Sequence, residues 1–378
     1  MSEKLTIRNF GPIKDMSFEF KKINVFIGDQ GTGKSTVAKL LSALKGVLLY
    51  SSNFKLIING EIATEEKEMD FFLDQFRQEL EIYGILNYLK YGSFIEFGDS
   101  LSSLKYEKEK IIFKKYAEKE NNKHTNLISY IPAYREAAVL LKDDLNAISA
   151  VGTTLPKLFY YFGQKFSVAK KAKSLYNYTD VLGVKYKYVG NNDIIVMKDG
   201  DEILIEDASS AINSGIPLLI VFDNAIESMY SKGNRNYTNQ NCPYIIVEEP
   251  ELNCFPATQK KMMEHFILKL KYEISSGFDY YCRLVITTHS PYILTSLNNL
   301  MFAYQVGQTH EEETNKIIEK KYWQNPEDVS AYMMLPNGEC ESIIDKEGLI
   351  KTEKLDSVSV VLNKEFNEIF DIELAIKK

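Results

Sequence analysis

The feature that most constrains this chain is a glycine-rich loop between an apolar strand and a helix. Residues 23–27 read Ile-Asn-Val-Phe-Ile, and the eight residues from Gly28 to Ser35 fit the pattern G-x-x-x-x-G-K-S. Glycines permit a tight turn that aims backbone N–H groups at phosphate oxygens. The helix expected from Thr36 directs the positive end of its dipole toward the same anion. The pattern therefore predicts a phosphate-binding loop for ATP or GTP.

The side chains of this loop have separate expected roles. Lys34 would reach the β- and γ-phosphates, and the Ser35 hydroxyl would bind Mg²⁺. A glycine-rich turn that serves only the fold is the alternative, and the complete eight-residue pattern between strand and helix disfavours it. The expected nucleotide-binding residues are Gly28, Asp29, Gln30, Gly31, Thr32, Gly33, Lys34, Ser35 and Thr36.

Composition is that of a globular protein with one large or two ordinary cores, because 45% of the 378 residues are hydrophobic and 26% are charged. The net charge of −7 leaves no global positive field that would attract nucleic acid. The chain shows neither an 18-residue apolar run nor an apolar signal core at its N-terminus. The cysteines lack CxxC spacing and stand at 242, 254, 282 and 340. We therefore expect a cytoplasmic protein with reduced thiols and no membrane contact.

Two further apolar strands are expected to end in polar side chains beside the loop. Residues 244–247 run into Glu248 and Glu249, and residues 284–288 run into His289. Because the carboxyl ends of parallel strands share one edge of a sheet, these side chains are expected near the phosphates. Glu248 would hold Mg²⁺ directly or through water, and Glu249 would polarise the attacking water. His289 would contact the γ-phosphate. Solvated strand ends and a structural histidine are the alternatives.

Another pattern, residues 206–214, places Ser209, Ser210 and Ala211 just before an apolar segment. Serines among small residues at a helix start present hydroxyl and backbone donors to an anion. Without context, a simple helix N-cap explains them equally well.

Taken in order, these motifs resemble an ABC-type ATPase head of the SMC/RecF-like and overcoming-lysogenization-defect-like group, which often carries AAA-type family names. Residues 5–13 resemble the opening strand and turn of that group, and Tyr130 to Arg135 resembles its Tyr-Ile-Pro-Ala-x-Arg segment. Glu248 to Pro256 resembles its Walker B motif and D-loop. The resemblance covers roughly residues 1–50 and 190–300 with the short segment between them.

The resemblance implies an α/β fold, an ABC-type P-loop ATPase head with a mixed sheet, flanking helices, antiparallel N-terminal strands and a largely helical insertion. It also implies a homodimer or higher even-numbered oligomer. ATP and Mg²⁺ would lie between the phosphate loop of one head and the signature serines, Ser209 and Ser210, of another. Asn253 matches the D-loop, and His289 matches the switch histidine. Ala211 stands where the family usually has glycine, which favours weak or partner-dependent hydrolysis.

The resemblance also suggests how the chain is divided. Residues 1–50 would be the N-terminal part of the head, and 51–190 a mostly helical insertion with a β-hairpin. Residues 191–300 would be the C-terminal part of the head, and 301–378 a C-terminal extension. This extension lacks the length and the carboxylate pattern of a TOPRIM nuclease, so any effector would be a separate protein.

One local basic stretch offers a nucleic-acid contact. Lysines lie among tyrosines here, a combination that suits a phosphate backbone and stacked bases. A solvated surface gives the same composition and is the alternative. The lysines that would form this patch are Lys165, Lys170, Lys171 and Lys173.

Stand-alone heads of this kind resemble the ATPase half of bacterial anti-phage modules such as Septu, retron-associated and PARIS-type systems. We therefore expect an ATPase that dimerises head to tail on ATP and regulates a separate nuclease or toxin. A DNA repair or recombination ATPase of RecF/SMC type and a weakly hydrolysing ATP-binding scaffold are the alternatives.

Overall fold

The central sheet carries the edge on which the expected site residues lie. The computed structural model describes residues 3–51, 57–58, 61–62, 65–98, 102–115, 128–140, 156–231, 243–271, 282–351 and 364–367. The strand order of the central sheet is β17-β16-β3-β15-β14-β9, with β17 antiparallel to β16 and the other neighbours parallel. These strands are β3 (Ile23–Gly28), β9 (Ile128–Ile131), β14 (Tyr244–Glu248), β15 (Arg283–Thr288), β16 (Val329–Met334) and β17 (Cys340–Ser342).

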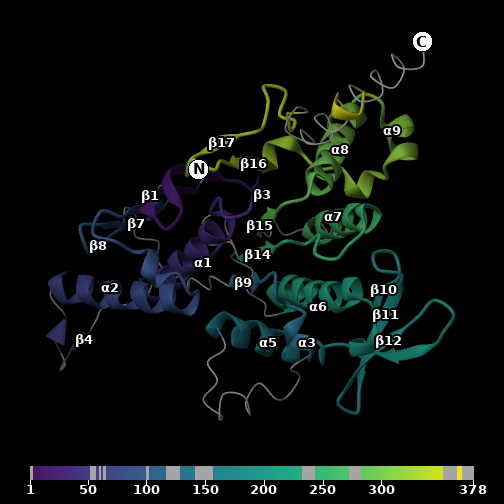
Figure 1. Cartoon of the computed structure of the whole chain (residues 1–378), viewed down its shortest axis with the longest axis horizontal. Helices are drawn as coiled ribbons and strands as arrows, with labels where there is room; N and C mark the ends of the chain where they lie inside the picture. The colour runs from purple at the N-terminus through teal and green to yellow at the C-terminus, as the bar shows by residue number, and fades with distance from the viewer. Residues whose placement is uncertain are drawn as a thin grey trace, which may run out of the picture.

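Helices cover both faces of this sheet, which explains why its strands are continuous apolar runs. On one face Tyr244 and Ile246 of β14 pack with α1 (Lys34–Ser51). On the other face Ile245 and Val247 pack in the cluster that holds three long helices. These helices are α6 (Ser210–Ser231), α7 (Pro256–Lys271) and α8 (Pro291–Gly307), shown in Figure 1 beside β14 and β15.

A second, fully antiparallel sheet confirms the expected antiparallel N-terminal strands. Its order is β2-β1-β6-β7-β8, and its apolar residues share one core cluster with α1 and α2 (Glu65–Ile82). Its strands are β1 (Glu3–Phe10), β2 (Ile13–Phe20), β6 (Phe94–Gly98), β7 (Ser102–Glu107) and β8 (Lys110–Lys115). Sequence patterns predict β6 and β8 but not β7, in which charged and polar residues surround Leu104 and Tyr106.

The remaining elements are a smaller lobe next to α6, a short helix that packs against α8, and a two-stranded ribbon. The order of the antiparallel sheet is β10-β11-β12-β13, and the hairpin expected at Asp199-Gly200 joins β12 to β13. These elements are α3 (Ala137–Leu140), α5 (Lys157–Ala169), β10 (Tyr176–Tyr178), β11 (Val184–Val189), β12 (Asn192–Val196), β13 (Glu202–Leu204) and α9 (Glu311–Ile317). A two-stranded ribbon pairs β4 (Ile57–Ile58) with β5 (Glu61–Ile62).

Two segments are more integrated into the sheets than sequence patterns indicate. Segment 51–190 supplies β6, which pairs with β1, and β9, which pairs with β14. Segment 301–378 supplies β16, which pairs with β3 along its whole length. The sheet that carries the phosphate loop therefore joins strands that lie about 300 residues apart in the sequence. Within the described residues, no helix is long and apolar enough to cross a membrane.

A buried group of charges ties the two sheets together at the N-terminal ends of β14 and β15. Glu3 of β1 accepts hydrogen bonds from Lys45 Nζ at 2.5 Å and from an Arg283 guanidinium nitrogen at 2.8 Å. The Tyr244 hydroxyl also donates to Glu3. All these side chains are almost fully buried. Burial raises the pKa of Glu3, but Lys45 and Arg283 outweigh this and hold it below its usual value.

Candidate nucleotide-binding site

The phosphate loop leaves β3 and enters α1 as the sequence indicates, although α1 begins at Lys34 rather than at Thr36. Gly28 has a φ of +152°, and a Cβ at this position would lie 2.4 Å from the carbonyl oxygen of Met334. Only glycine fits between β3 and β16 there. Within the loop, the Thr32 hydroxyl donates to the Asp29 carbonyl at 2.8 Å. Asp29, Gln30 and Gly31 are exposed at its tip.

Lys34 is buried inside this loop and points toward its backbone. Its Nζ lies 2.7 Å from the carbonyl oxygens of both Gly28 and Asp29, and 3.5 Å from Nδ1 of His289. Desolvation lowers the pKa of Lys34 to about 8, against the opposing effect of Glu249, Asp29 and Glu251. The ammonium group therefore stands among the phosphate loop, the β14 turn and the end of β15.

The expected metal-binding Glu248, which ends β14, and the expected catalytic Glu249, which follows it, differ in environment. Glu248 is buried, and one of its oxygens accepts from the backbone N–H of Ala133 at 3.2 Å. Glu249 is about one third exposed and adopts a left-handed φ of +44°. This conformation is unusual for a residue with a side chain. One Glu249 carboxylate oxygen lies 3.8 Å from Nε2 of His289, so the structure brings Lys34, Glu249 and His289 together.

Glu251, to which sequence reasoning had assigned no role, holds the histidine in place. Its carboxylate accepts from the backbone N–H of His289 at 2.7 Å. Burial raises the pKa of Glu251, while that hydrogen bond opposes the change. The sequence signal that could have indicated this role is the third acid of the Glu-Glu-Pro-Glu run. Glu251 lies in the turn after β14, from which its carboxylate reaches the backbone that follows β15.

Oxygen atoms near the end of β14 fit a hydrated divalent cation. The second carboxylate oxygen of Glu248 and the hydroxyl of Thr287 are buried without a hydrogen-bond partner among the described residues. Buried polar atoms are nearly always satisfied, so unpaired oxygens on adjacent strands indicate a missing partner. Mg²⁺ prefers oxygen ligands and keeps several waters. Glu248 and the partly exposed Ser35 are the expected residues that would hold it.

The serines of the expected signature lie exposed at the start of α6, and no hydrogen bond joins them to the phosphate loop in the described structure. Ala211 lies in the first turn of α6 and packs against the core cluster. A helical backbone accommodates its methyl group without strain, and its effect on hydrolysis stays a prediction. Asn253 has a φ of +58° and donates to Glu136.

Arg135 links these parts and was singled out in the sequence only as part of a resembling segment. Its guanidinium is fully buried and donates to four backbone carbonyl oxygens. The acceptors are Pro132 at 3.2 Å, Ser214 at 2.9 Å, Glu248 at 2.8 Å and Glu249 at 2.8 Å. No periodicity or composition reveals such a role, because the acceptors are main-chain atoms.

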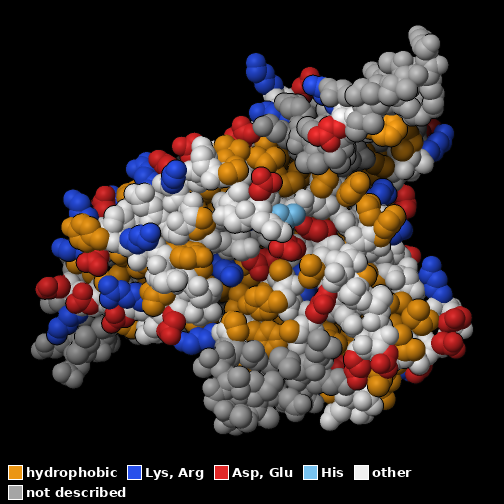
Figure 2. Space-filling model, in the orientation of Figure 1, with side chains coloured by type: hydrophobic (Ala, Val, Ile, Leu, Met, Phe, Trp, Pro, Cys, Tyr) orange, Lys and Arg blue, Asp and Glu red, His pale blue; other side chains and the backbone are white. Residues whose placement is uncertain are grey.

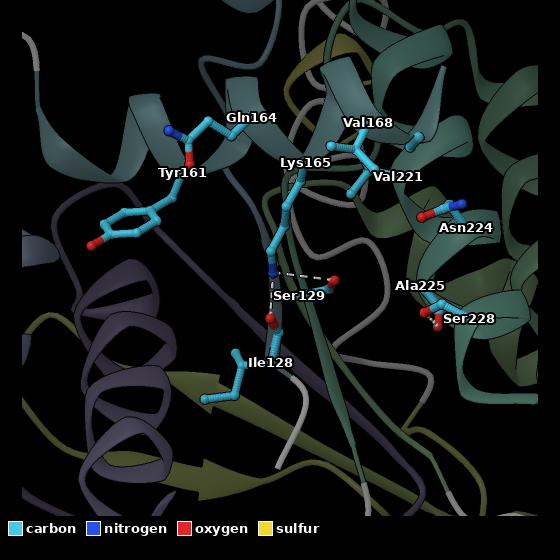
Figure 3. A pocket seen from close by; sticks show the side chains of 11 residues that line it. Ile128, Ser129, Tyr161, Gln164, Lys165, Val168, Val221, Asn224, Ala225 and Ser228 are labelled. Atoms are coloured by element: carbon cyan, nitrogen blue, oxygen red, sulfur yellow. Dashed lines mark hydrogen bonds between the residues drawn. The ribbon is translucent and has the colours of Figure 1, made fainter. Parts of the chain in front are cut away.

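The four lysines of the expected basic patch do not form one exposed surface, because two of them make contacts inside the fold. Lys165 points at the edge strand β9, where its Nζ donates to the carbonyl of Ile128 and lies 3.4 Å from the Ser129 hydroxyl (Figure 3). Burial lowers the pKa of Lys165 to about 8. Lys170 forms a buried ion pair with Asp193 at 3.0 Å. These lysines are used within the fold, which explains their spacing among aromatic residues.

Two lysines of the expected patch remain nearer the surface. Lys173 pairs with Glu227 at 2.5 Å, and the Lys171 ammonium lies 5.5 Å from the centre of the Tyr188 ring. On the face shown in Figure 2, basic side chains are scattered among acidic ones. Lys165 also lines a pocket of about 370 Å³ between β9, α5 and α6 (Figure 3). None of the expected nucleotide-binding residues lines this pocket.

Comparison with solved structures finds similar heads at low identity. An SMC head domain from Thermotoga maritima is 9% identical with a TM-score of 0.39, covering 90% of this chain and 98% of that one. An Smc head from Pyrococcus furiosus, bound to the C-terminal domain of ScpA, is 10% identical with a TM-score of 0.41, covering 98% and 99%. A structure of the recombination mediator RecF with an ATP analogue is 10% identical with a TM-score of 0.40, covering 91% and 98%.

Comparison with curated protein sequences gives no match. A family model described as AAA ATPase domain matches residues 1–148 and 101–294. These two matches overlap and together span the phosphate loop, the Tyr-Ile-Pro-Ala-x-Arg segment, the Glu-Glu strand and His289. The chain belongs to the AAA ATPase domain family.

Proposed function

We propose that this chain binds ATP with Mg²⁺ and hydrolyses it at a site completed by a second copy. The observation that carries the proposal is the convergence of Lys34, Glu249 and His289 at one edge of the central sheet. In this arrangement Lys34 would neutralise the terminal phosphates, and Glu249 would orient the attacking water. His289 would contact the γ-phosphate from the end of β15.

The exposed serines at the start of α6 support a second copy as the source of further donors to the nucleotide. Ser209 and Ser210 are exposed and stand at the positive end of a 22-residue helix, so they suit an anion brought by another molecule. Two copies placed head to tail would each supply a phosphate loop and a pair of serines. A homodimer or a higher even-numbered oligomer follows from this geometry.

Glu249→Gln separates binding from hydrolysis and tests this proposal. Gln keeps the size of the side chain but removes the carboxylate, so turnover should fall while ATP binding persists. The variant should accumulate as an ATP-dependent dimer, detected by light scattering coupled to gel filtration. Lys34→Ala is the matched control, which should neither bind nucleotide nor dimerise. A Glu249→Gln variant that stays monomeric at saturating MgATP would refute the composite site.

The role of this hydrolysis is proposed from the resemblance to anti-phage ATPases. The ATP-dependent dimer would regulate a separate cytoplasmic effector, a nuclease or a toxin. The internal contacts of Lys165 and Lys170 take two lysines away from the basic patch that the alternative, a DNA repair ATPase of RecF/SMC type, could use to bind DNA. Turnover measured with and without duplex and single-stranded DNA separates the two. Stimulation of several-fold by DNA alone would favour repair over effector control.

A further inference from the structure

Arg135 joins three chain segments that are far apart in the sequence. Its four acceptors belong to the turn after β9, to the first turns of α6, and to the end of β14 with the turn that follows it. The side chain has no exposed surface. The acceptors at the end of β14 are the carbonyls of Glu248 and Glu249, the residues expected to hold Mg²⁺ and to orient water, respectively.

A planar guanidinium suits this position, and an ammonium group does not. Arginine presents five N–H donors in a rigid fork, whereas lysine concentrates its charge at one point. Here the Nε atom donates to Ser214 while the two terminal nitrogens donate to the three other carbonyls. The donors thus point in fixed directions toward separate segments. Burial lowers the pKa of Arg135 to about 10, so the group stays charged at neutral pH.

Neighbouring contacts reinforce the same connection. The Ser214 hydroxyl donates to the carbonyl of Leu252 at 3.0 Å, in the turn after β14. Glu136, adjacent to Arg135, accepts from the side chain of Asn253. Ser214 is fully buried one turn after the exposed serines that begin α6. The start of α6 is therefore fastened to the turn that carries Glu249.

We propose that Arg135 is a positioning residue that makes the start of α6 and the Glu249 turn move as one unit. This inference rests on the proposed function, in which Ser209 and Ser210 serve the nucleotide of the partner subunit. Nucleotide bound by one copy would then set the geometry of the serines that the same copy offers to its partner. Arg135 makes no hydrogen bond to the phosphate loop in the described structure, so it acts on coupling rather than on binding in its own subunit.

The first test is Arg135→Lys, which keeps the charge and removes the fork. We expect the Kd for a fluorescent ATP analogue to stay within about threefold of wild type, because the phosphate loop is intact. We expect kcat to fall by about a hundredfold, the effect of misplacing a catalytic group by about 1 Å. Arg8→Lys is the matched control. Arg8 is half-exposed, pairs with Asp15 and lies outside the site, so turnover should not change.

Amide hydrogen exchange reports the coupling itself. In wild type, adding the ATP analogue should change exchange both in residues 28–36 and in residues 209–216. In Arg135→Lys the change at 28–36 should remain, and the change at 209–216 should disappear. A variant that transmits the change to 209–216 as wild type does would overturn the proposal. A structural role alone would alter exchange equally with and without nucleotide.

Ser214→Ala provides an independent variant should Arg135→Lys fail to fold. It removes the hydroxyl contact to Leu252 and leaves the carbonyl that Arg135 uses. We expect a smaller loss of kcat with unchanged analogue affinity and a weaker exchange response at 209–216. An unchanged exchange response at 209–216 in this variant would count against the proposed link between the start of α6 and the Glu249 turn. If wild type neither hydrolyses ATP nor dimerises, the proposed function fails, while the exchange response in the isolated subunit still decides the role of Arg135.

Discussion

Nucleotide affinity should fall steeply in mildly alkaline solution because of the environment of Lys34. Its Nζ is enclosed by the carbonyls of Gly28 and Asp29, and desolvation brings its pKa to about 8. A triphosphate favours the protonated amine, since the phosphates are anionic. As the pH rises through the pKa of the free protein, binding must take up a proton, and affinity therefore falls.

The size of this effect follows from the protonated fraction of Lys34. With a pKa of about 8, roughly three quarters of the molecules carry the charge at pH 7.5 and about 3% at pH 9.5. If only the charged form is competent, the apparent Kd rises about 25-fold over this range. A terminal phosphate, whose second pKa is about 6, is already ionised throughout, so the ligand contributes little to the change.

Isothermal titration with a slowly hydrolysed ATP analogue at five pH values between 7.5 and 9.5 measures this slope. Lys34→Arg is the matched control, because a guanidinium stays charged across the whole range. The wild-type Kd should rise while the Kd of the variant stays nearly flat. Equal slopes in the two proteins would show that another group titrates, and a flat wild-type curve would refute the buried-ammonium argument.

Three further predictions follow from the described contacts. Glu249→Gln should lower kcat by about a hundred- to ten-thousand-fold, the usual loss of a general base, as measured by phosphate release. Glu3→Gln should destabilise the fold by about 3–5 kcal/mol in urea unfolding, because two buried cations lose their carboxylate. Since the pKa of Glu3 is lowered in the fold, wild type should lose this stabilisation as the pH falls below 4.5, and the variant should not. Lys170→Glu should lower the unfolding midpoint by opposing Asp193, whereas Lys171→Glu should leave it unchanged; equal midpoints would contradict the buried pair.

Those parts of the site that depend on local sequence could be predicted. The phosphate loop, the acids after β14 and His289 after β15 each combine an apolar strand with a polar end, and parallel pairing brings such ends together. The N-terminal antiparallel strands follow from alternation of apolar and polar residues in the same way. These features need only short-range patterns and one rule of sheet topology.

Features that depend on main-chain contacts between distant segments could not be predicted. Arg135 bonds to carbonyl groups, which every residue carries, so its partners leave no trace in residue types. Lys165 and Lys170 read as a solvent-facing basic cluster, yet one binds an edge strand and the other meets Asp193 in the interior. Sequence patterns show the charges of these lysines and conceal the direction of their side chains.

The pairing of β16 with β3 has a consequence for the synthesis of the chain. Met334 presses its carbonyl against the glycine that opens the phosphate loop, and Ser330 donates to Asn24 within β3 at 2.8 Å. A nascent chain that ends before residue 329 lacks this neighbour, although its first 300 residues contain every motif of the site. We expect ribosome-bound chains that end before residue 329 not to be retained on an ATP affinity resin. Chains in which residues up to 342 have left the exit tunnel should be retained. Competence to bind ATP would then require β16 to have left the exit tunnel and paired with β3.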